Sequence, residues 1–195
     1  MLTIDDVSIV EGDSGTSTAS ITVTRTGSSA GDLNHLALVS FTTQDGTATG
    51  AEGDYIASSG TLAFTADPTE LTQTQVITVQ INGDTLTETD ETFQLLLTGS
   101  SSALTTIADN SGLITISNND STSLSISDAS APENETLTFN VSLSEVAGAD
   151  ITFRVNTQTG TANHSDYTFL SDQLVTIKAG DLSTDVTVYV HDDAN

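Results

Sequence analysis

Hydrophobic and polar residues alternate along most of the chain. The clearest alternating runs are TASITVTR (18–25), QVITVQI (75–81), TFQLLL (92–97), TLTFNVSL (136–143), ITFRV (151–155) and DVTVYV (185–190). Because side chains two positions apart lie on the same face of a β-strand, each run has one apolar face and one polar face. Short strands separated by turns rich in Gly, Asp, Asn and Ser are typical of antiparallel sandwiches. The pattern therefore predicts an all-β protein built from antiparallel β-sandwiches.

The chain contains two copies of one sequence unit. The matching segments are IDDVSIVEG (4–12) with ISDASAPEN (126–134), DGTA (45–48) with TGTA (159–162), GDY (53–55) with SDY (165–167), GTLAF (60–64) with QLVTI (173–177), and VQINGD (79–84) with VYVHDD (188–193). The repeat predicts a first domain over residues 1–120 and a second domain over residues 121–195. We expect the junction between them in SNNDSTS (117–123).

The second copy is shorter than the first. After Asp84 the first copy continues through TFQLLL (92–97) and GLITIS (112–117), which we expect to be its last two strands. The second copy stops soon after the matching Asp193. A sandwich without these strands exposes an apolar face and an unpaired strand edge. We therefore expect the chain to be cut from a longer array of repeats, with strands supplied by another chain as the alternative.

The net charge of the chain limits the classes of molecule that it is expected to bind. The chain has 27 acidic residues against three basic ones, a net charge of −24. Phosphate backbones are repelled at this charge, so nucleic-acid binding is not expected. An acidic surface suits hard cations, which prefer oxygen ligands, but it also serves simply to keep a protein soluble. No apolar run is long enough to span a membrane, and no signal peptide is visible at the N-terminus.

No catalytic constellation can be argued from the residues. GDSG (12–15) resembles the nucleophile loop of trypsin-like serine proteases, in which the histidine base precedes the serine. Here all three histidines follow Ser14, and the segment lies where a turn is expected before a strand. The histidines are scattered, cysteine is absent, and His35 is interpreted as a surface residue at the start of a strand. The sequence predicts a protein that is not an enzyme.

Carboxylates in loops are the remaining candidates for chemistry. Glu11 precedes the first long strand, Asp54 follows the DGTA turn and Asp84 follows the VITVQI strand. Loops at alternate strand ends gather at one end of a sandwich, where two like charges about 4 Å apart repel by about 4 kcal/mol at an effective dielectric near 20. A divalent cation would relieve this repulsion. Asp and Gly are also ordinary turn formers, which is the alternative for any one of these residues.

The first copy combines the motifs EGDSG, VTRTG, DGTA, GDY, SGTLAF, INGDTLTETDETFQLLL and ITISNND. This combination resembles the Calx-beta domain. This family occurs as calcium-sensing units of sodium–calcium exchangers, in one integrin subunit and repeatedly in large bacterial surface proteins. The resemblance implies an immunoglobulin-like sandwich that binds Ca²⁺ with the loops at one end. In the first copy it implies the metal ligands Glu11, Asp54, Asp84, Glu88, Glu91 and Asp120. In the second copy it implies Glu133, Asp166, Asp192 and Asp193.

Departures from the family pattern limit the expected number of ions. Asn82 and Gly83 stand where the exchanger domains have acids, and Asn118 and Asn119 precede Asp120 in the terminal acidic triplet. The resemblance therefore implies one or two Ca²⁺ ions in the first copy. The glutamate pair of the second copy falls outside the sequence, so its site is expected to be weak or absent.

These observations together favour a calcium-stiffened structural or adhesive repeat of a large extracellular or cell-surface bacterial protein. Its expected partners are calcium ions, neighbouring repeats of the same parent chain and other cell-surface molecules. Two alternatives stay open: a metal-independent acidic spacer repeat, and a regulatory calcium sensor within a membrane protein.

Overall fold

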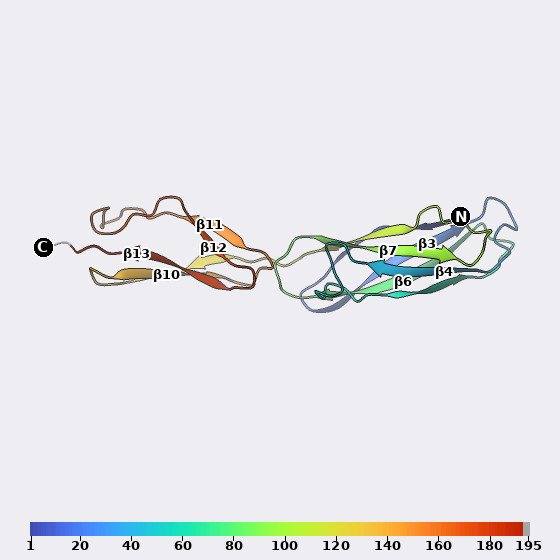
Figure 1. The fold of residues 1–195 in the computed structure, drawn as a ribbon, viewed down its shortest axis with the longest axis horizontal. Helices are drawn as coiled ribbons and strands as arrows, with labels where there is room; N and C mark the ends of the chain where they lie inside the picture. Colours follow the sequence, from blue (N-terminus) through green and yellow to red (C-terminus); the bar gives the residue numbers. More distant parts are fainter. Residues whose placement is uncertain (193–195) are drawn as a thin grey trace. The chain divides into compact units, whose positions relative to one another are not determined.

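The computed structural model describes residues 1–192 and contains only strands, turns and loops over this range (Figure 1). No helix within residues 1–192 is long and apolar enough to cross a membrane. The chain divides into two compact units. Unit 1 consists of Met1–Asp84 and Thr89–Asn119, and unit 2 consists of Thr85–Glu88 together with Asp120–Asn195.

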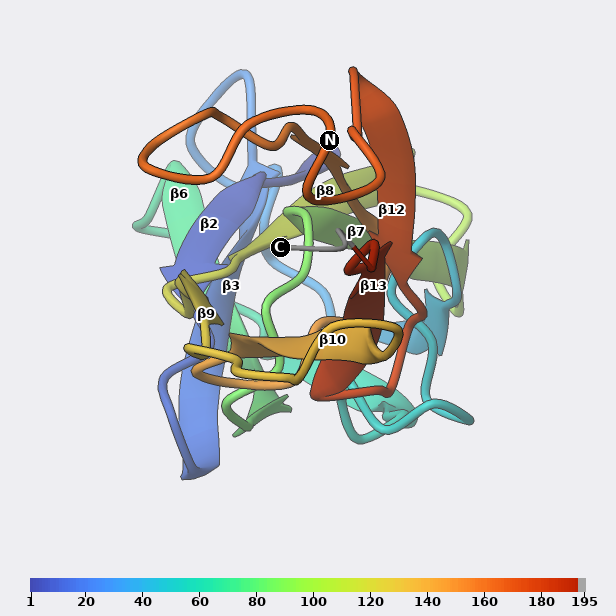
Figure 2. The ribbon, with the colours of Figure 1, turned by 90° about the vertical axis from the view of Figure 1, so that its left-hand side faces the viewer.

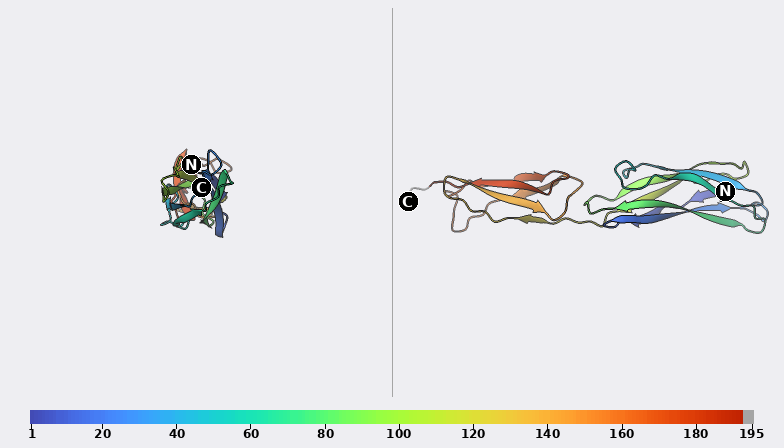
Figure 3. Two further views of the ribbon diagram at one scale, coloured as in Figure 1. Left: turned by 90° about the vertical axis from the view of Figure 1, so that its right-hand side faces the viewer. Right: turned by 90° about the horizontal axis from the view of Figure 1, so that it is seen from below.

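Unit 1 is a two-layer β-sandwich. Its strands are β1 (Leu2–Ile4), β2 (Val7–Val10), β3 (Gly15–Thr26), β4 (Ala37–Gln44), β5 (Ser59–Phe64), β6 (Thr72–Gly83), β7 (Glu91–Ser100) and β8 (Ser111–Ser117). One sheet has the order β1-β3-β6 and the other has the order β2-β8-β7-β4-β5. Figure 3 shows the two layers of this unit from a second direction.

The alternation in the sequence decides which side chains fill the space between the layers. On β3 the inward positions Ala19, Ile21 and Val23 are buried, and the residues between them face outward. On β7 the inward positions Phe93 and Leu95 are buried in the same core. Both strands follow the period of two that places alternate side chains on one face.

One pair of strands in unit 1 is parallel. β2 pairs with β8 in the register Val7↔Ile114 to Val10↔Ser117, whereas the other strand pairs of the unit are antiparallel. β1 and β2 are separated by Asp5 and Asp6, and the chain switches there from one sheet to the other. The second strand and the last strand of the sandwich therefore lie side by side within one sheet.

Unit 2 has the same plan with fewer strands in the described range. Its strands are β9 (Leu124–Ile126), β10 (Thr136–Leu143), β11 (Ile151–Val155), β12 (Gln173–Ile177) and β13 (Ser183–Tyr189). They form a sheet of order β13-β10-β9, whose strands are labelled in Figure 2, and a two-stranded sheet of β11 and β12, which are labelled in Figure 1. By sequence and pairing, β10 to β13 correspond to β3 to β6. No strand within residues 120–192 corresponds to β7 or β8.

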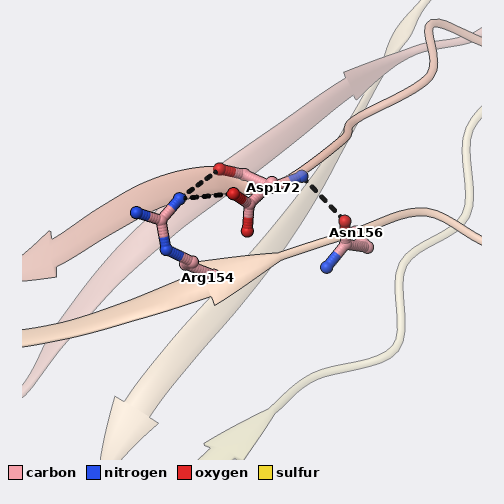
Figure 4. A network of polar contacts seen from close by, with 3 residues as sticks. All are labelled: Arg154, Asn156 and Asp172. Atoms are coloured by element: carbon pink, nitrogen blue, oxygen red, sulfur yellow. Dashed lines mark hydrogen bonds and ion pairs between the residues drawn. The ribbon is translucent and has the colours of Figure 1, made fainter.

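The hairpin of β11 and β12 is fixed by a polar network at the end where the loop 156–172 connects the two strands (Figure 4). The Arg154 guanidinium donates to the carboxylate of Asp172 at 2.7 Å and to its carbonyl oxygen at 2.9 Å. The Asp172 N–H donates to the side-chain oxygen of Asn156 at 2.7 Å. Asp172 has a φ of +56°, in the left-handed region, so the three polar contacts support a tight turn into β12.

The predicted fold class is confirmed. The alternating runs lie on β3, β6, β7, β10, β11 and β13, and the two copies fold as β-sandwich units.

Candidate metal site

Three loops meet at one end of unit 1. Glu11 directly follows β2 and is buried, and Gly83 at the end of β6 packs so closely that a Cβ there would overlap the carbonyl oxygen of Gly12. Gly12 has a φ of +87°, and its N–H donates to the side-chain oxygen of Asn119 at 2.9 Å. Gly83 is needed because a side chain would not fit this close approach, and Gly12 is favoured because its φ lies in the left-handed region. The ends of β2, β6 and β8 are thereby brought together.

Asp54 reaches the same end through the loop that follows β4. Its carboxylate accepts a hydrogen bond from the Thr49 N–H at 2.6 Å, and its carbonyl oxygen accepts one from the Asn82 N–H at 3.0 Å. Asp166, its counterpart in unit 2, accepts an equivalent bond from the Asn163 N–H at 2.7 Å. One carboxylate oxygen of each aspartate therefore organises its own loop. This supports the turn-forming role. In Asp166 the other carboxylate oxygen also accepts a bond, from the Ser165 hydroxyl at 3.4 Å.

The Gly-Thr-Ala corner of this loop holds the first residues of β7. The Ala48 N–H donates to the Thr92 carbonyl oxygen at 3.0 Å, and the Thr92 N–H donates to the Thr47 hydroxyl at 2.8 Å. A Cβ at Gly46 would overlap the same Thr92 carbonyl oxygen. The corner is thus a clamp for a strand, which explains why the motif needs glycine at this position.

Tyr55 closes the loop. Its hydroxyl donates to the Asp45 carboxylate at 2.5 Å, and burial together with this bond raises the pKa of Tyr55 to about 12. The same hydrogen bond, with one from the Gly50 N–H, lowers the pKa of Asp45. The hydrogen bond between Tyr55 and Asp45 therefore joins the two ends of the loop that presents Asp54.

Asparagines stand beside the acids at this end. The Asn118 N–H donates to the Asp90 carboxylate at 3.1 Å, and the Asn119 side-chain amide donates to the Asp13 carboxylate. Glu91 begins β7 and lies in register with Ile116 of β8. Glu11, Asp84 and Glu91 therefore lie at strand ends at one end of unit 1, and Asp54 lies in the loop between β4 and β5 that reaches the same end.

Two other predicted ligands of the first copy belong to unit 2. Glu88 packs against Gly148, where an added Cβ would lie 2.8 Å from the glutamate Oε1. Gly148 N–H also donates to the Thr87 carbonyl oxygen at 3.0 Å. Asp120 opens the segment that leads to β9. Both acids are at the end of unit 2 where β10 leads into β11.

The predicted ligands of the second copy lie at the other end of unit 2. Asn134, next to Glu133, donates its N–H to Val190, and the His191 N–H donates to the Asp166 carbonyl oxygen at 2.8 Å. Asp192 follows directly. The remaining predicted ligand, Asp193, lies outside the described residues.

The donors fit a hard cation in chemistry, since they are carboxylates, amide oxygens and carbonyl oxygens. The acidic side chains by themselves do not form a complete set of ligands. Within residues 1–192 no group of three or more His, Asp or Glu side chains is close enough together to hold a metal ion. Amide and backbone oxygens would therefore have to complete any coordination shell.

A second polar cluster was missed by the sequence prediction. Arg25 is only 1% exposed, and its guanidinium donates to the His35 carbonyl oxygen and to the Gln73 side-chain oxygen, both at 3.1 Å. His35 Nε2 lies 2.6 Å from Arg25 Nη2 and 3.0 Å from the Thr105 hydroxyl. Arg25, His35 and Thr105 border a hollow of about 810 Å³. His35, for which the sequence predicts a surface position at the start of a strand, is half-buried and lies two residues before β4.

The signal for this cluster was present in the sequence. Arg25 continues the inward positions of Ala19, Ile21 and Val23 at the same spacing of two, which places it on the core face of β3. Burial lowers the pKa of Arg25. A cation on an apolar face predicts a buried partner network.

Comparisons with known proteins agree with this architecture. The Calx-beta domain matches the chain twice, over residues 4–129 and 117–194. A comparison with curated protein sequences finds no match. Among solved structures, "Crystal structure of CBD12 from CALX1.2" is similar with a TM-score of 0.51 and 20% identity over 100% of this chain and 76% of that chain.

A second solved structure, "Crystal structure of calcium binding domain CBD12 of CALX1.1", has a TM-score of 0.51 and 19% identity over 99% of this chain and 76% of that chain. At these identities the similarity concerns the fold. The two sequence matches together span residues 4–194 and confirm the resemblance found in the sequence. The chain therefore belongs to the Calx-beta domain family.

Proposed function

We propose that the chain is a calcium-binding structural and adhesive module of a larger extracellular protein. The observation that carries this proposal is that the strand ends bearing Glu11, Asp84 and Glu91 and the loop bearing Asp54 lie at the same end of unit 1. Its membership of the Calx-beta family supports it, and so does the calcium-binding description of the CALX1.1 structure. The proposed role is binding rather than catalysis.

Calcium would add a direct link between loops that hydrogen bonds and the stacking of Tyr55 on Phe93 already hold. Asp54 and Glu11 come from segments far apart in sequence, and a cation bound to both joins these segments directly. It also reduces the repulsion within a chain of net charge −24. The expected result is a stiffer loop region and a higher free energy of unfolding.

The proposal places the module outside the cell, where its partners are calcium ions, neighbouring repeats and other cell-surface molecules. Extracellular modules typically bind Ca²⁺ with a Kd of about 10⁻⁴ to 10⁻³ M. A free Ca²⁺ concentration ten- to a hundredfold above Kd adds about 1.4 to 2.7 kcal/mol of stability per site. A metal-independent spacer gains nothing, and a high-affinity regulatory sensor responds at much lower calcium.

The test is a pair of thermal melts of the whole chain, in EDTA and in millimolar CaCl₂, with calorimetric titration of Ca²⁺. The variants Glu11→Gln and Glu91→Gln each remove a charge at the proposed site. Glu70→Gln is the matched control, because Glu70 is exposed in the loop between β5 and β6, at the opposite end of unit 1. We expect calcium to raise the melting temperature of the wild type and the control more than that of the site variants. An equal melting temperature with and without calcium for the wild type would overturn the proposal.

A further inference from the structure

Arg25 and His35 meet at the end of unit 1 that lies opposite to the predicted calcium ligands. The end of β3 is flanked there by the β3–β4 loop (residues 27–36) and the β7–β8 loop (residues 101–110). Arg25 is 1% exposed, Thr105 is 6% exposed and His35 is half-buried. A titratable side chain is thus packed between a buried cation and the hydroxyl of a second loop.

The contact with Arg25 decides where the ring of His35 carries its proton. Nε2 of His35 lies 2.6 Å from Nη2 of Arg25 and 3.0 Å from the Thr105 hydroxyl. A guanidinium stays protonated and has N–H donors but no acceptor. Nε2 therefore accepts from Arg25 without a proton of its own, so the ring is neutral and carries its hydrogen on Nδ1. The Thr105 hydroxyl faces the same unprotonated nitrogen and donates to it.

The charges around His35 come from β3, from its own loop and from the N-terminus. The residues with charged groups that border the hollow are Arg25, Asp32 and Met1, whose amino group donates to a main-chain carbonyl oxygen at 2.8 Å. The side chain that β6 contributes to the cluster, Gln73, is neutral. The β7–β8 loop adds no charged side chain to the lining of the hollow.

Asp32 keeps a fixed negative charge in the range in which histidines take up a proton. Hydrogen bonds from the hydroxyls and the N–H groups of Ser28 and Ser29 lower the pKa of Asp32 to about 2. The carboxylate therefore does not titrate near neutral pH. It offers a negative charge on the border of the hollow to a ring that becomes positive.

A proton on Nε2 of His35 is incompatible with the contact to Arg25. It turns the acceptor into a donor that faces another donor, and it places a second positive charge 2.6 Å from the first. Like charges that lie this close repel, and most strongly where little water surrounds them. A hydroxyl can accept as well as donate, so Thr105 tolerates the protonated ring. The ring must therefore move away from Arg25 when it is protonated.

Main-chain and side-chain bonds of the cluster remain when the ring moves. Arg25 keeps the His35 carbonyl oxygen and the Gln73 side-chain oxygen as acceptors. The β3–β4 loop also stays attached to the loop between β5 and β6, because the Gly31 N–H donates to the Pro68 carbonyl oxygen at 3.1 Å. The movement is thus confined to the ring and to its link with the β7–β8 loop.

We propose that Arg25, His35 and Thr105 form an acid-sensitive latch. The neutral ring of His35 joins β3 to the β7–β8 loop, and protonation releases the ring from Arg25 into the hollow. The hollow of about 810 Å³ has room for it, and Asp32 provides an opposite charge there. Acid therefore loosens this end of unit 1 and leaves the core in place. The latch does not depend on the proposed calcium role, since the predicted ligands lie at the other end of the unit.

The latch makes the stability of unit 1 depend on pH in a defined direction. Folding holds His35 without the proton that a histidine of the unfolded chain takes up around pH 6.5. The stabilisation from the latch is therefore present above this pH and is lost as the pH falls below it.

The first test is the tautomer of His35, read from the imidazole nitrogen chemical shifts of the whole chain labelled with ¹⁵N-histidine. The chain has three histidines, so single His→Gln variants assign the signals. At pH 8 we expect a hydrogen on Nδ1 of His35 and none on Nε2. On acidification the His35 signals and the amide signal of Thr105 should change together. An Nε2–H tautomer at pH 8 would overturn the latch.

The second test compares melting temperatures at pH 7.5 and pH 5 by scanning calorimetry. His35→Gln keeps an oxygen that can accept from Arg25 and cannot be protonated. We expect the wild type to lose at least about 4 °C more than this variant between the two pH values. His164→Gln is the matched control, because it removes a histidine that stacks on Phe169 in unit 2, and it should lose as much as the wild type.

The two tests separate the latch from a general effect of acid. Other titrating groups are the same in the wild type and in His35→Gln, so their contribution cancels in the comparison. An equal loss in these two proteins would contradict the latch, and so would a loss that His164→Gln abolishes. The tautomer is measured in the wild type, so it decides the matter even when His35→Gln does not fold.

Discussion

The ring of Tyr55 lies flat against the ring of Phe93, with centroids 3.9 Å apart and planes 6° from parallel. Tyr55 follows Asp54 in the loop after β4, and Phe93 lies two residues after Glu91 at the start of β7. The stacked pair therefore joins two of the segments that carry predicted calcium ligands. Stacked aromatic pairs contribute about 0.5 to 1.5 kcal/mol beyond the area that they bury.

Removing the tyrosine hydroxyl should affect the two units differently. Tyr55→Phe loses the hydrogen bond to Asp45, and we expect a loss of about 1 to 3 kcal/mol in the free energy of unfolding of unit 1. Tyr167→Phe removes a buried hydroxyl without a partner, so unit 2 should keep its stability or gain slightly. Scanning calorimetry of both variants checks this, and a larger loss in Tyr167→Phe would contradict it.

Replacing the two corner glycines by alanine should also affect the stability of the two units differently. Gly46→Ala forces a Cβ into the Thr92 carbonyl oxygen and should destabilise unit 1 by about 1 to 3 kcal/mol. Gly160→Ala meets no atom within 4 Å and should shift the melting temperature of unit 2 by no more than a surface substitution does. The comparison uses urea denaturation followed by circular dichroism. Equal losses in the two variants would show that the corner is strained by itself rather than shaped for β7.

Asp32 should contribute stability that depends on pH. Its carboxylate accepts hydrogen bonds from the N–H groups and the hydroxyls of Ser28 and Ser29, which lower its pKa to about 2. Since the folded pKa lies below the unfolded value of about 3.9, this contribution is fully present above pH 4 and is lost as the pH falls through 2.

The measurement is the urea midpoint of the wild type and of Asp32→Asn at pH 5 and at pH 2. The wild type should be more stable at pH 5, and the difference between the two proteins should shrink at pH 2. The difference isolates Asp32 from the other acids, which titrate in both proteins. A constant difference would mean that the loop hydrogen bonds do not depend on the charge.

Replacing Arg25 should destabilise unit 1 although an apolar residue stands at the matching place in unit 2. Leu143 occupies that place and is buried. Arg25→Leu leaves the carbonyl oxygen of His35 and the side-chain oxygen of Gln73 without their donor, at a cost of about 1 to 3 kcal/mol. Arg25→Lys keeps the charge but lacks the second guanidinium nitrogen, which lies against His35 Nε2, so its stability should fall between the two. Chemical denaturation measures all three proteins, and an Arg25→Leu variant as stable as the wild type would contradict the prediction.

The core could be predicted from sequence because it depends on alternation alone. Ile21, Val23, Phe93 and Leu95 are buried where the period of two placed them. The repeat also identified equivalent loops, and Asp54 and Asp166 do make the same hydrogen bond to their own loops. Both results depend on patterns within one strand or one loop, which do not require knowledge of how the loops pack together.

The candidate site was harder to predict because it depends on how loops pack. Glu88 follows β6 in sequence, yet it packs against Gly148 in unit 2, and no alternation or spacing indicates this. The charge of Arg25 favours a surface position, although its spacing from Ile21 and Val23 places it on the core face of β3. The ligand roles of the acids stay predictions until calcium binding is measured.

The parallel pairing of β2 with β8 has a mechanical consequence. These two strands lie near the beginning and the end of unit 1, and they run in the same direction from Val7↔Ile114 to Val10↔Ser117. When the two ends of this unit are pulled apart, β2 and β8 are drawn past each other along their length. Their hydrogen bonds are then sheared together instead of opening one after another, so the sandwich resists tension with all of them at once.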